Sequence, residues 1–171
     1  MKKADIKVMP KYYDTYINEV ENIDLSDALI KYGPNLLEAE KEHLTNIGNK
    51  VYTPGKWTVK EIIQHLIDSE RVFNYRALRF ARNDKTVLPG YEENDYAKES
   101  NADSRSIEDL LTEFANLRRS TLDMFNSFDD EMLQREGICF NTNVSVLALG
   151  FVLAGHVLHH TNVIREKYFS L

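Results

Sequence analysis

Apolar residues recur at three- and four-residue steps over four long segments, which is the pattern of amphipathic helices. The segments span about 25–45, 59–82, 107–128 and 146–169 of the 171-residue chain. The 7 glycines and 4 prolines are too sparse for the many turns of a β-rich fold. Four such helices in one chain predict an all-α fold, a four-helix bundle.

Several helix boundaries are marked by particular residues. Thr58 with Glu61, and Ser106 with Asp109, have the spacing of capping boxes at the starts of the second and third helices. Gly33-Pro34 interrupts the first helix. Because proline lacks the backbone donor that a helix interior needs, we expect this helix to kink or split there.

Three connecting segments lack a clear helical period. A long stretch between the second and third helices, "KTVLPGYEENDYAKESNADS", is rich in turn formers. Loops of this length are often functional but also occur as solvated connectors, and both interpretations stay open. Tyr91 and Tyr96 in this loop are candidates for contact with a substrate. The segment "YYDTYINEV" near the N-terminus predicts a short helix or an arm over the bundle, and residues 129–143 a short turn of helix or strand.

Size and charge restrict the class of protein. The length fits one domain, residues 1–171. A net charge of −6 argues against nucleic acid or an anionic membrane as a partner. We see no secretory signal, and the apolar run "VSVLALGFVLAG" is too short for a membrane span, so we expect a cytoplasmic protein. Cys139 is the single cysteine, which excludes an internal disulfide and predicts an inert thiol.

The stretch "GHVLHH", residues 155–160, holds three of the five histidines. His156 and His160 are four residues apart, so on a helix they lie about 40° apart on one face. That face also carries Leu149, Leu153, Val157 and Ile164 and therefore points into the bundle. His159 diverges from His160 by about 100° and is not expected to share a ligand with it.

His65 on the second helix provides a third inward imidazole. Two histidines from one helix and one from another form a three-nitrogen metal site with open positions, which is typical of catalytic sites. The alternative is that carboxylates or backbone carbonyls satisfy these histidines, which then only pack in the core. His43 follows the surface pattern of the first helix and is not expected to bind metal.

Charged residues of the second helix have two possible roles. Asp68, three residues after His65, is either a carboxylate that orients an imidazole or activates water, or a solvent-facing acid. Glu70 falls on the apolar stripe, where an ion pair with an arginine of the same helix would explain it. Arg76 is a candidate for binding a substrate carboxylate.

Three segments together resemble the DinB/YfiT-like superfamily. "GKWTVKEIIQHLIDSERVFNYRALRFARND" resembles its second-helix signature, "LPGYEENDYA" the loop that follows, and "SVLALGFVLAGHVLHHTNVIREKY" its last helix. The resemblance implies an up-down four-helix bundle with a long loop between helices 2 and 3. It also implies a divalent metal, nickel or zinc, bound by His65, His156 and His160, the residues that spacing had already selected.

The resemblance narrows the activity to two related reactions. Members of the family are described as metal-dependent hydrolases, or transfer low-molecular-weight thiols such as bacillithiol or mycothiol. We therefore expect an enzyme that activates a water or thiol nucleophile against a small molecule. The alternative is a metal- or small-molecule-binding bundle without turnover. Family members are often dimers, so a homodimer is a further expectation.

Overall fold

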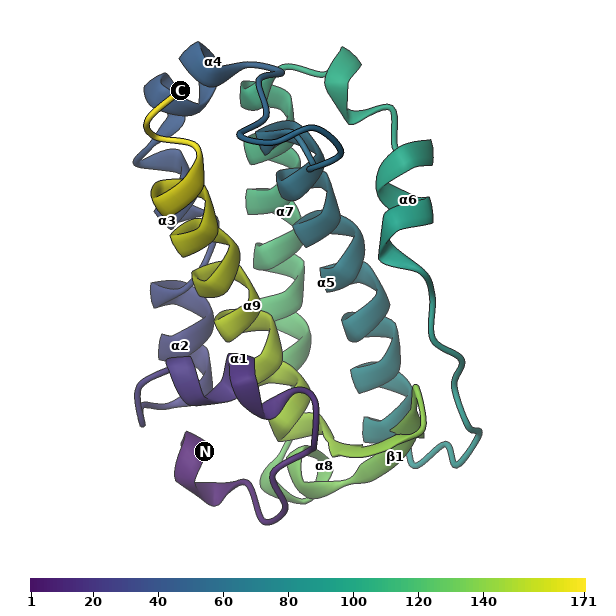
Figure 1. Cartoon of the computed structure of the whole chain (residues 1–171). Coiled ribbons are helices and arrows are strands. Elements are labelled where there is room, and N and C mark those ends of the chain that lie inside the picture. The colour runs from purple at the N-terminus through teal and green to yellow at the C-terminus, as the bar shows by residue number, and fades with distance from the viewer.

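A computed structural model describes all 171 residues and confirms the four-helix bundle (Figure 1). Two strands, β1 (Glu136–Cys139) and β2 (Thr142–Ser145), form a small antiparallel hairpin. Short 3₁₀ turns cover Lys3–Asp5 and Ala102–Ser104. The helices are α1 (Asp14–Glu19), α2 (Leu25–Lys31), α3 (Asn35–Glu38), α4 (Lys41–Ile47), α5 (Val59–Ala81), α6 (Glu93–Glu99), α7 (Ile107–Asn126), α8 (Asp130–Gln134) and α9 (Val146–Lys167).

The first predicted helix is split into three short helices, α2, α3 and α4, which together form one side of the bundle. The break between α2 and α3 falls at Gly33-Pro34, as the missing donor of proline requires. By contrast, α5 is one uninterrupted helix. Both bonds of its capping box are present, because Thr58 accepts from the Glu61 amide and Glu61 accepts from the Thr58 amide.

The helix directions do not simply alternate along the chain, as they would in the simplest up-down bundle. Helices α5 and α7 run parallel, because their contacts advance together along both helices. Arg118 of α7 pairs with Glu70 of α5, and further along Thr121 of α7 bonds Asn74 of α5. The segment between α5 and α7 makes this possible, since it returns along the outside of the bundle to the end where α5 began (Figure 1). This segment is not fully irregular, because it contains α6.

Helix α9 lies at the centre of the bundle, between α5 on one side and α1 and α2 on the other. By length and composition it could cross a membrane, but 72% of its most apolar window is buried inside the protein. Its apolar character is therefore explained by its central position. The short helix α1, part of the predicted N-terminal arm, packs directly across it.

The close approach of α1 to α9 depends on Gly155. A Cβ placed there would lie 2.1 Å from the backbone oxygen of Tyr16 and 2.5 Å from its carbonyl carbon. We expect Gly155→Ala to destabilise the protein by about 1–3 kcal/mol, measured by urea unfolding, because α1 has to move. Gly150→Ala in the same helix is the matched control. Its new methyl meets only side-chain atoms of Leu25 and Phe125, which can shift, so a cost equal to that of Gly155→Ala would contradict this explanation.

Glu70 is buried and its partner comes from another helix. The prediction that Glu70 pairs with an arginine of α5 is wrong. Arg118 of α7 donates bidentate hydrogen bonds to the Glu70 carboxylate, with nitrogen–oxygen distances of 2.6–3.1 Å. The two side chains are only 4% and 2% exposed. The parallel arrangement of α5 and α7 brings these residues to the same level, which the spacing along α5 alone does not reveal.

Candidate metal centre

The structure brings His65, His156 and His160 together between α5 and α9. The Nε2 atom of His156 lies 3.1 Å from the Nε2 atoms of both His65 and His160. All three nitrogens lie within 4.8 Å of one another. His156 and His160 are on one face of α9, one turn apart, and His65 faces them from α5.

Two of the three nitrogen separations fit a shared divalent ion. Two imidazole nitrogens bound to zinc at about 2.0–2.1 Å, at angles of 90–110°, are about 2.8–3.4 Å apart. The two observed separations of 3.1 Å fall inside this range. Apart from each other, these nitrogens have no hydrogen-bond partner in the protein. A donor set of three imidazoles suits first-row ions such as zinc, nickel, copper and iron.

The three imidazoles are neutral at physiological pH. Burial lowers the pKa of His65 to about 4. Burial, with a contribution from the neighbouring histidines, lowers the pKa of His160 to about 3 and that of His156 well below its usual range. A neutral imidazole keeps the lone pair that a metal needs, so burial prepares these side chains as ligands.

Aromatic rings hold the histidines in place. The indole of Trp57 lies 4.8 Å from the His65 ring, and the ring of Tyr16 lies 5.1 Å from that of His156, both between centroids. The Nδ1 atom of His160 is buried without a hydrogen-bond partner. This is unusual for a metal-binding histidine, whose second nitrogen normally donates to a carbonyl or carboxylate.

The two remaining histidines do not join this cluster. His159 points to the surface, where its Nδ1 atom lies 3.3 Å from a carboxylate oxygen of Glu19. His43 is exposed on α4 and packs against Phe169. Neither side chain converges with the other three.

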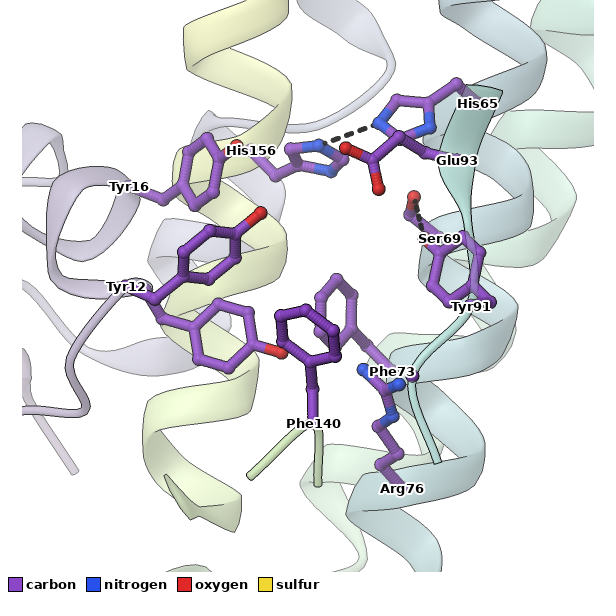
Figure 2. Close-up of a pocket in the computed structure, with 12 residues that line it drawn as sticks. Tyr12, Tyr16, His65, Ser69, Phe73, Arg76, Tyr91, Glu93, Phe140 and His156 are labelled. Atoms are coloured by element: carbon purple, nitrogen blue, oxygen red, sulfur yellow. Dashed lines mark hydrogen bonds between the residues drawn. The ribbon is translucent and has the colours of Figure 1, made fainter. Parts of the chain in front are cut away.

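A cavity opens beside the histidine cluster (Figure 2). Its volume is about 80 Å³, which is room for a small molecule or part of one. The lining comes from the N-terminal arm, α5, the α5–α7 segment, the hairpin turn and α9. The lining residues are Tyr12, Tyr13, Tyr16, His65, Ser69, Phe73, Arg76, Gly90, Tyr91, Glu93, Phe140 and His156.

Two of the candidate substrate-binding residues line this cavity and one does not. Arg76 reaches it from near the C-terminal end of α5. Tyr91 lies on the same side of the cavity as Arg76, with its hydroxyl 2.7 Å from that of Ser69 (Figure 2). Tyr96 is 48% exposed and packs on the outer side of Tyr91, with ring centroids 4.8 Å apart. The loop therefore contributes Tyr91, and Tyr96 supports it from outside.

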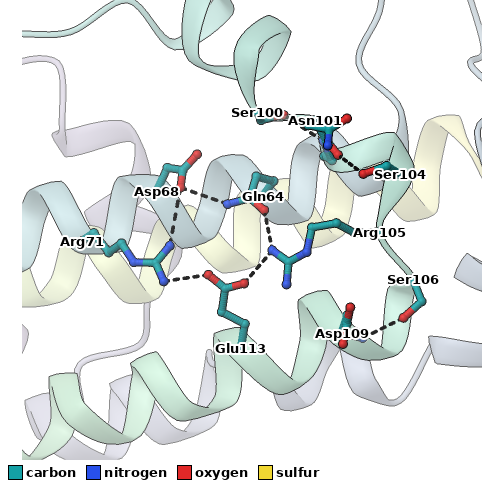
Figure 3. A network of polar contacts seen from close by, with 11 residues as sticks. Gln64, Asp68, Arg71, Ser100, Asn101, Ser104, Arg105, Ser106, Asp109 and Glu113 are labelled. Carbon is teal, nitrogen blue, oxygen red and sulfur yellow. Dashed lines mark hydrogen bonds and ion pairs between the residues drawn. The ribbon is translucent and has the colours of Figure 1, made fainter.

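Asp68 lies outside the cavity, in a polar network between α5 and α7 (Figure 3). Its carboxylate accepts from Gln64 at 3.0 Å and lies 3.6 Å from Arg71. Arg71 and Arg105 both pair with Glu113 of α7. Burial raises the pKa of Asp68, although the neighbouring amide and arginines oppose the shift. The structure thus assigns Asp68 to a contact between helices and does not bring it to the histidines.

Glu93, in the first turn of α6, was not predicted from the sequence as a site residue. Figure 2 shows its carboxylate pointing into the cavity on the side of His65 and His156. The carboxylate has no ion pair or hydrogen bond within the protein. Burial is the main cause that raises the pKa of Tyr16 to about 12, and the charges of Tyr12 and Glu93 add to it. The acidic run "YEEND" gave no period that would have singled out Glu93.

The tyrosines of the N-terminal arm were also missed as site residues. Tyr12 and Tyr16 extend their rings into the cavity from the arm and α1 (Figure 2). The repeated tyrosines in "YYDTY" are the only signal that would have pointed to them. Their approach depends on the packing of α1 against Gly155, which is a tertiary contact.

Comparison with known proteins agrees with this architecture. A structure described as YfiT from Bacillus subtilis, "a probable metal-dependent hydrolase with an unusual four-helix bundle topology", superimposes with a TM-score of 0.66. The similarity covers 91% of this chain and 85% of that chain, at 17% sequence identity, and so shows a common fold. Among curated protein sequences none matches. The family model of the DinB superfamily matches residues 25–164. Because this match spans most of the chain and all four sides of the bundle, the protein belongs to the DinB superfamily.

Proposed function

We propose that this protein is a divalent-metal-dependent enzyme that acts on a small molecule, with nickel or zinc held by His65, His156 and His160. One observation carries the proposal. Three neutral imidazole nitrogens converge beside a cavity that His65 and His156 line, with His160 partly buried behind them, and no fourth protein ligand joins them. Three protein ligands with an open position are typical of catalytic zinc sites, whereas structural sites are closed by four.

The chemistry follows from the surroundings of this cluster. When bound, the ion supplies Lewis acidity, which lowers the pKa of a water or thiol in the cavity. Glu93 is the one carboxylate that lines the cavity, and we assign it the role of accepting the proton that the nucleophile loses. This assignment replaces Asp68, whose Oδ1 is engaged by Gln64 and Arg71 and which does not line the cavity.

The cavity walls position the substrate and limit the access of water. Rings of Tyr12, Phe73 and Phe140 enclose the space below the histidines (Figure 2). The hydrogen bond between Ser69 and Tyr91 ties the α5–α7 segment to α5. A substrate that enters would therefore be held by aromatic surface on several sides, with its reacting end toward the histidines.

A paired assay distinguishes the two reactions that this site supports. Protein purified without a histidine tag is loaded with zinc or nickel and given an aryl ester without thiol, or an activated aryl halide with a panel of low-molecular-weight thiols. Metal-dependent ester cleavage identifies a hydrolase, and metal-dependent thiol consumption identifies a thiol S-transferase. Stoichiometric metal without turnover in either assay would contradict the proposal of an enzyme. It would favour the alternative, a metal-binding bundle without turnover.

Replacing Glu93 by Gln tests its role in proton transfer. The change keeps the size of the side chain and removes the proton acceptor, so we expect the turnover rate to fall by about 10²–10⁴-fold. The metal content, measured by elemental mass spectrometry, should stay at the wild-type level. Glu92→Gln is the matched control, because Glu92 is the exposed neighbour outside the cavity. Full turnover in Glu93→Gln would contradict the assignment.

A further inference from the structure

The protein contains two buried arginines with very different surroundings. Arg118 is 4% exposed, faces the Glu70 carboxylate and donates to the carbonyl oxygens of Leu29 and Tyr32. Arg76 is 3% exposed, yet no carboxylate lies within ion-pair distance of it. Its one hydrogen bond within the protein runs from Nη2 to the Pro89 carbonyl oxygen, at 2.9 Å.

An unpaired buried guanidinium is costly unless something compensates its charge. The rings of Phe73 and Tyr91 compensate part of the charge through cation–π contacts, since the guanidinium carbon lies 5.4 Å and 6.0 Å from their centroids. A guanidinium has five N–H donors in a rigid fork that matches a carboxylate. Only one of these donors is used inside the protein. Arg76 is therefore prepared for an anionic partner from outside.

The position of Arg76 defines where that partner would lie. Arg76 is eleven residues after His65 on α5, which places both side chains on nearly the same face, with their Cα atoms about 16 Å apart along the helix. Figure 2 shows the guanidinium entering the cavity at the end opposite the histidines, with Phe73 and Phe140 between them. The cavity thus has a cationic end, an aromatic middle and a metal-binding end.

We infer that Arg76 binds the carboxylate of an elongated substrate with an apolar body, whose opposite end carries the reacting group at the histidine cluster. This inference rests on the proposed function and names its substrate class. The other charged side chain of the cavity, Glu93, lies at the histidine end, where its negative charge offsets part of the charge of a bound divalent ion. Arg76 is the one Arg or Lys side chain that lines the cavity, so a substrate whose reacting group occupies the metal position places its carboxylate toward Arg76.

The test compares a matched pair of probes, 3-phenylpropanoate and its neutral analogue 3-phenylpropanamide. Their dissociation constants are measured by calorimetry and ligand-observed NMR on the zinc-loaded and the chelator-treated protein. We expect the carboxylate to bind at least tenfold more tightly than the amide, with and without zinc. Arg76→Gln should remove this preference, and Arg76→Lys, which keeps the charge without the fork, should retain part of it. Arg71→Gln is the matched control, because Arg71 is half-exposed and already paired with Glu113.

Three results would overturn the inference. The first is an equal affinity of the wild-type protein for the two probes. The second is a carboxylate preference that is lost when zinc is removed and that survives Arg76→Gln, which would place the anion on the metal. The third is an Arg76→Gln protein with a lowered melting temperature and an unchanged preference, which would make Arg76 only a support for the Pro89 segment. The zinc content of Arg76→Gln should equal that of the wild type, so failure here is distinguishable from failure of the metal site.

Discussion

Replacing His156 by Ala should remove most of the bound metal and, with it, all metal-dependent activity. His156 is the central member of the proposed ligand set, because its Nε2 atom lies 3.1 Å from those of both other histidines. Loss of residues that merely orient a ligand typically costs about 10–100-fold in metal affinity, so the loss of this ligand should cost at least about 100-fold. Competition with a chromophoric chelator, on protein without a histidine tag, measures the change.

The neighbouring histidines provide matched controls for this experiment. His65→Ala and His160→Ala should also lose the metal. His159→Ala should retain it, because the His159 ring faces Glu19 at the surface. Full stoichiometric metal in His156→Ala, or a loss in His159→Ala equal to that in His160→Ala, would show that the ligands are assigned to the wrong residues.

Replacing Arg118 by Met should cost the largest amount of stability of any change considered. The Glu70 carboxylate would remain buried, with only the hydroxyl of Thr121 at 2.6 Å as a partner. Breaking a buried ion pair by removing one member costs about 3–5 kcal/mol, because the other charge is left without compensation. For a protein of this size, that corresponds to a fall in melting temperature of about 6–20 °C. Urea and thermal unfolding at neutral pH measure both quantities.

A double variant separates the ion pair from the general packing. Glu70→Leu together with Arg118→Met removes both charges, so it should recover a large part of the lost stability. Arg71→Gln disrupts the partly exposed pair with Glu113 and should cost about 1 kcal/mol or less. If the double variant were less stable than Arg118→Met, the cost would arise from lost contacts of the arginine and not from an unpaired carboxylate.

The candidate metal ligands could be predicted from the sequence because their geometry is mostly local. The four-residue spacing of His156 and His160 alone places both imidazoles on one face of a helix. His65 needed one further assumption, that the inner faces of two helices meet, and the apolar stripes of both helices supported it. The boundaries of α5 and the break at Pro34 were equally predictable, because a capping box and a missing backbone donor act within one turn.

Only the tertiary structure decided which other residues share the site with these histidines. Glu93 and Tyr16 reach the cavity from segments without a clear period, and their positions depend on where α6 and α1 pack. Asp68 is three residues from His65, yet it lies in the contact between α5 and α7 and not beside α9, because α7 lies on that side of α5. The partner of Glu70 depended on α5 and α7 running parallel. Helix periodicity states which face is buried, whereas the neighbour of that face is chosen by the path of the connecting segments, through contacts between residues far apart in the chain.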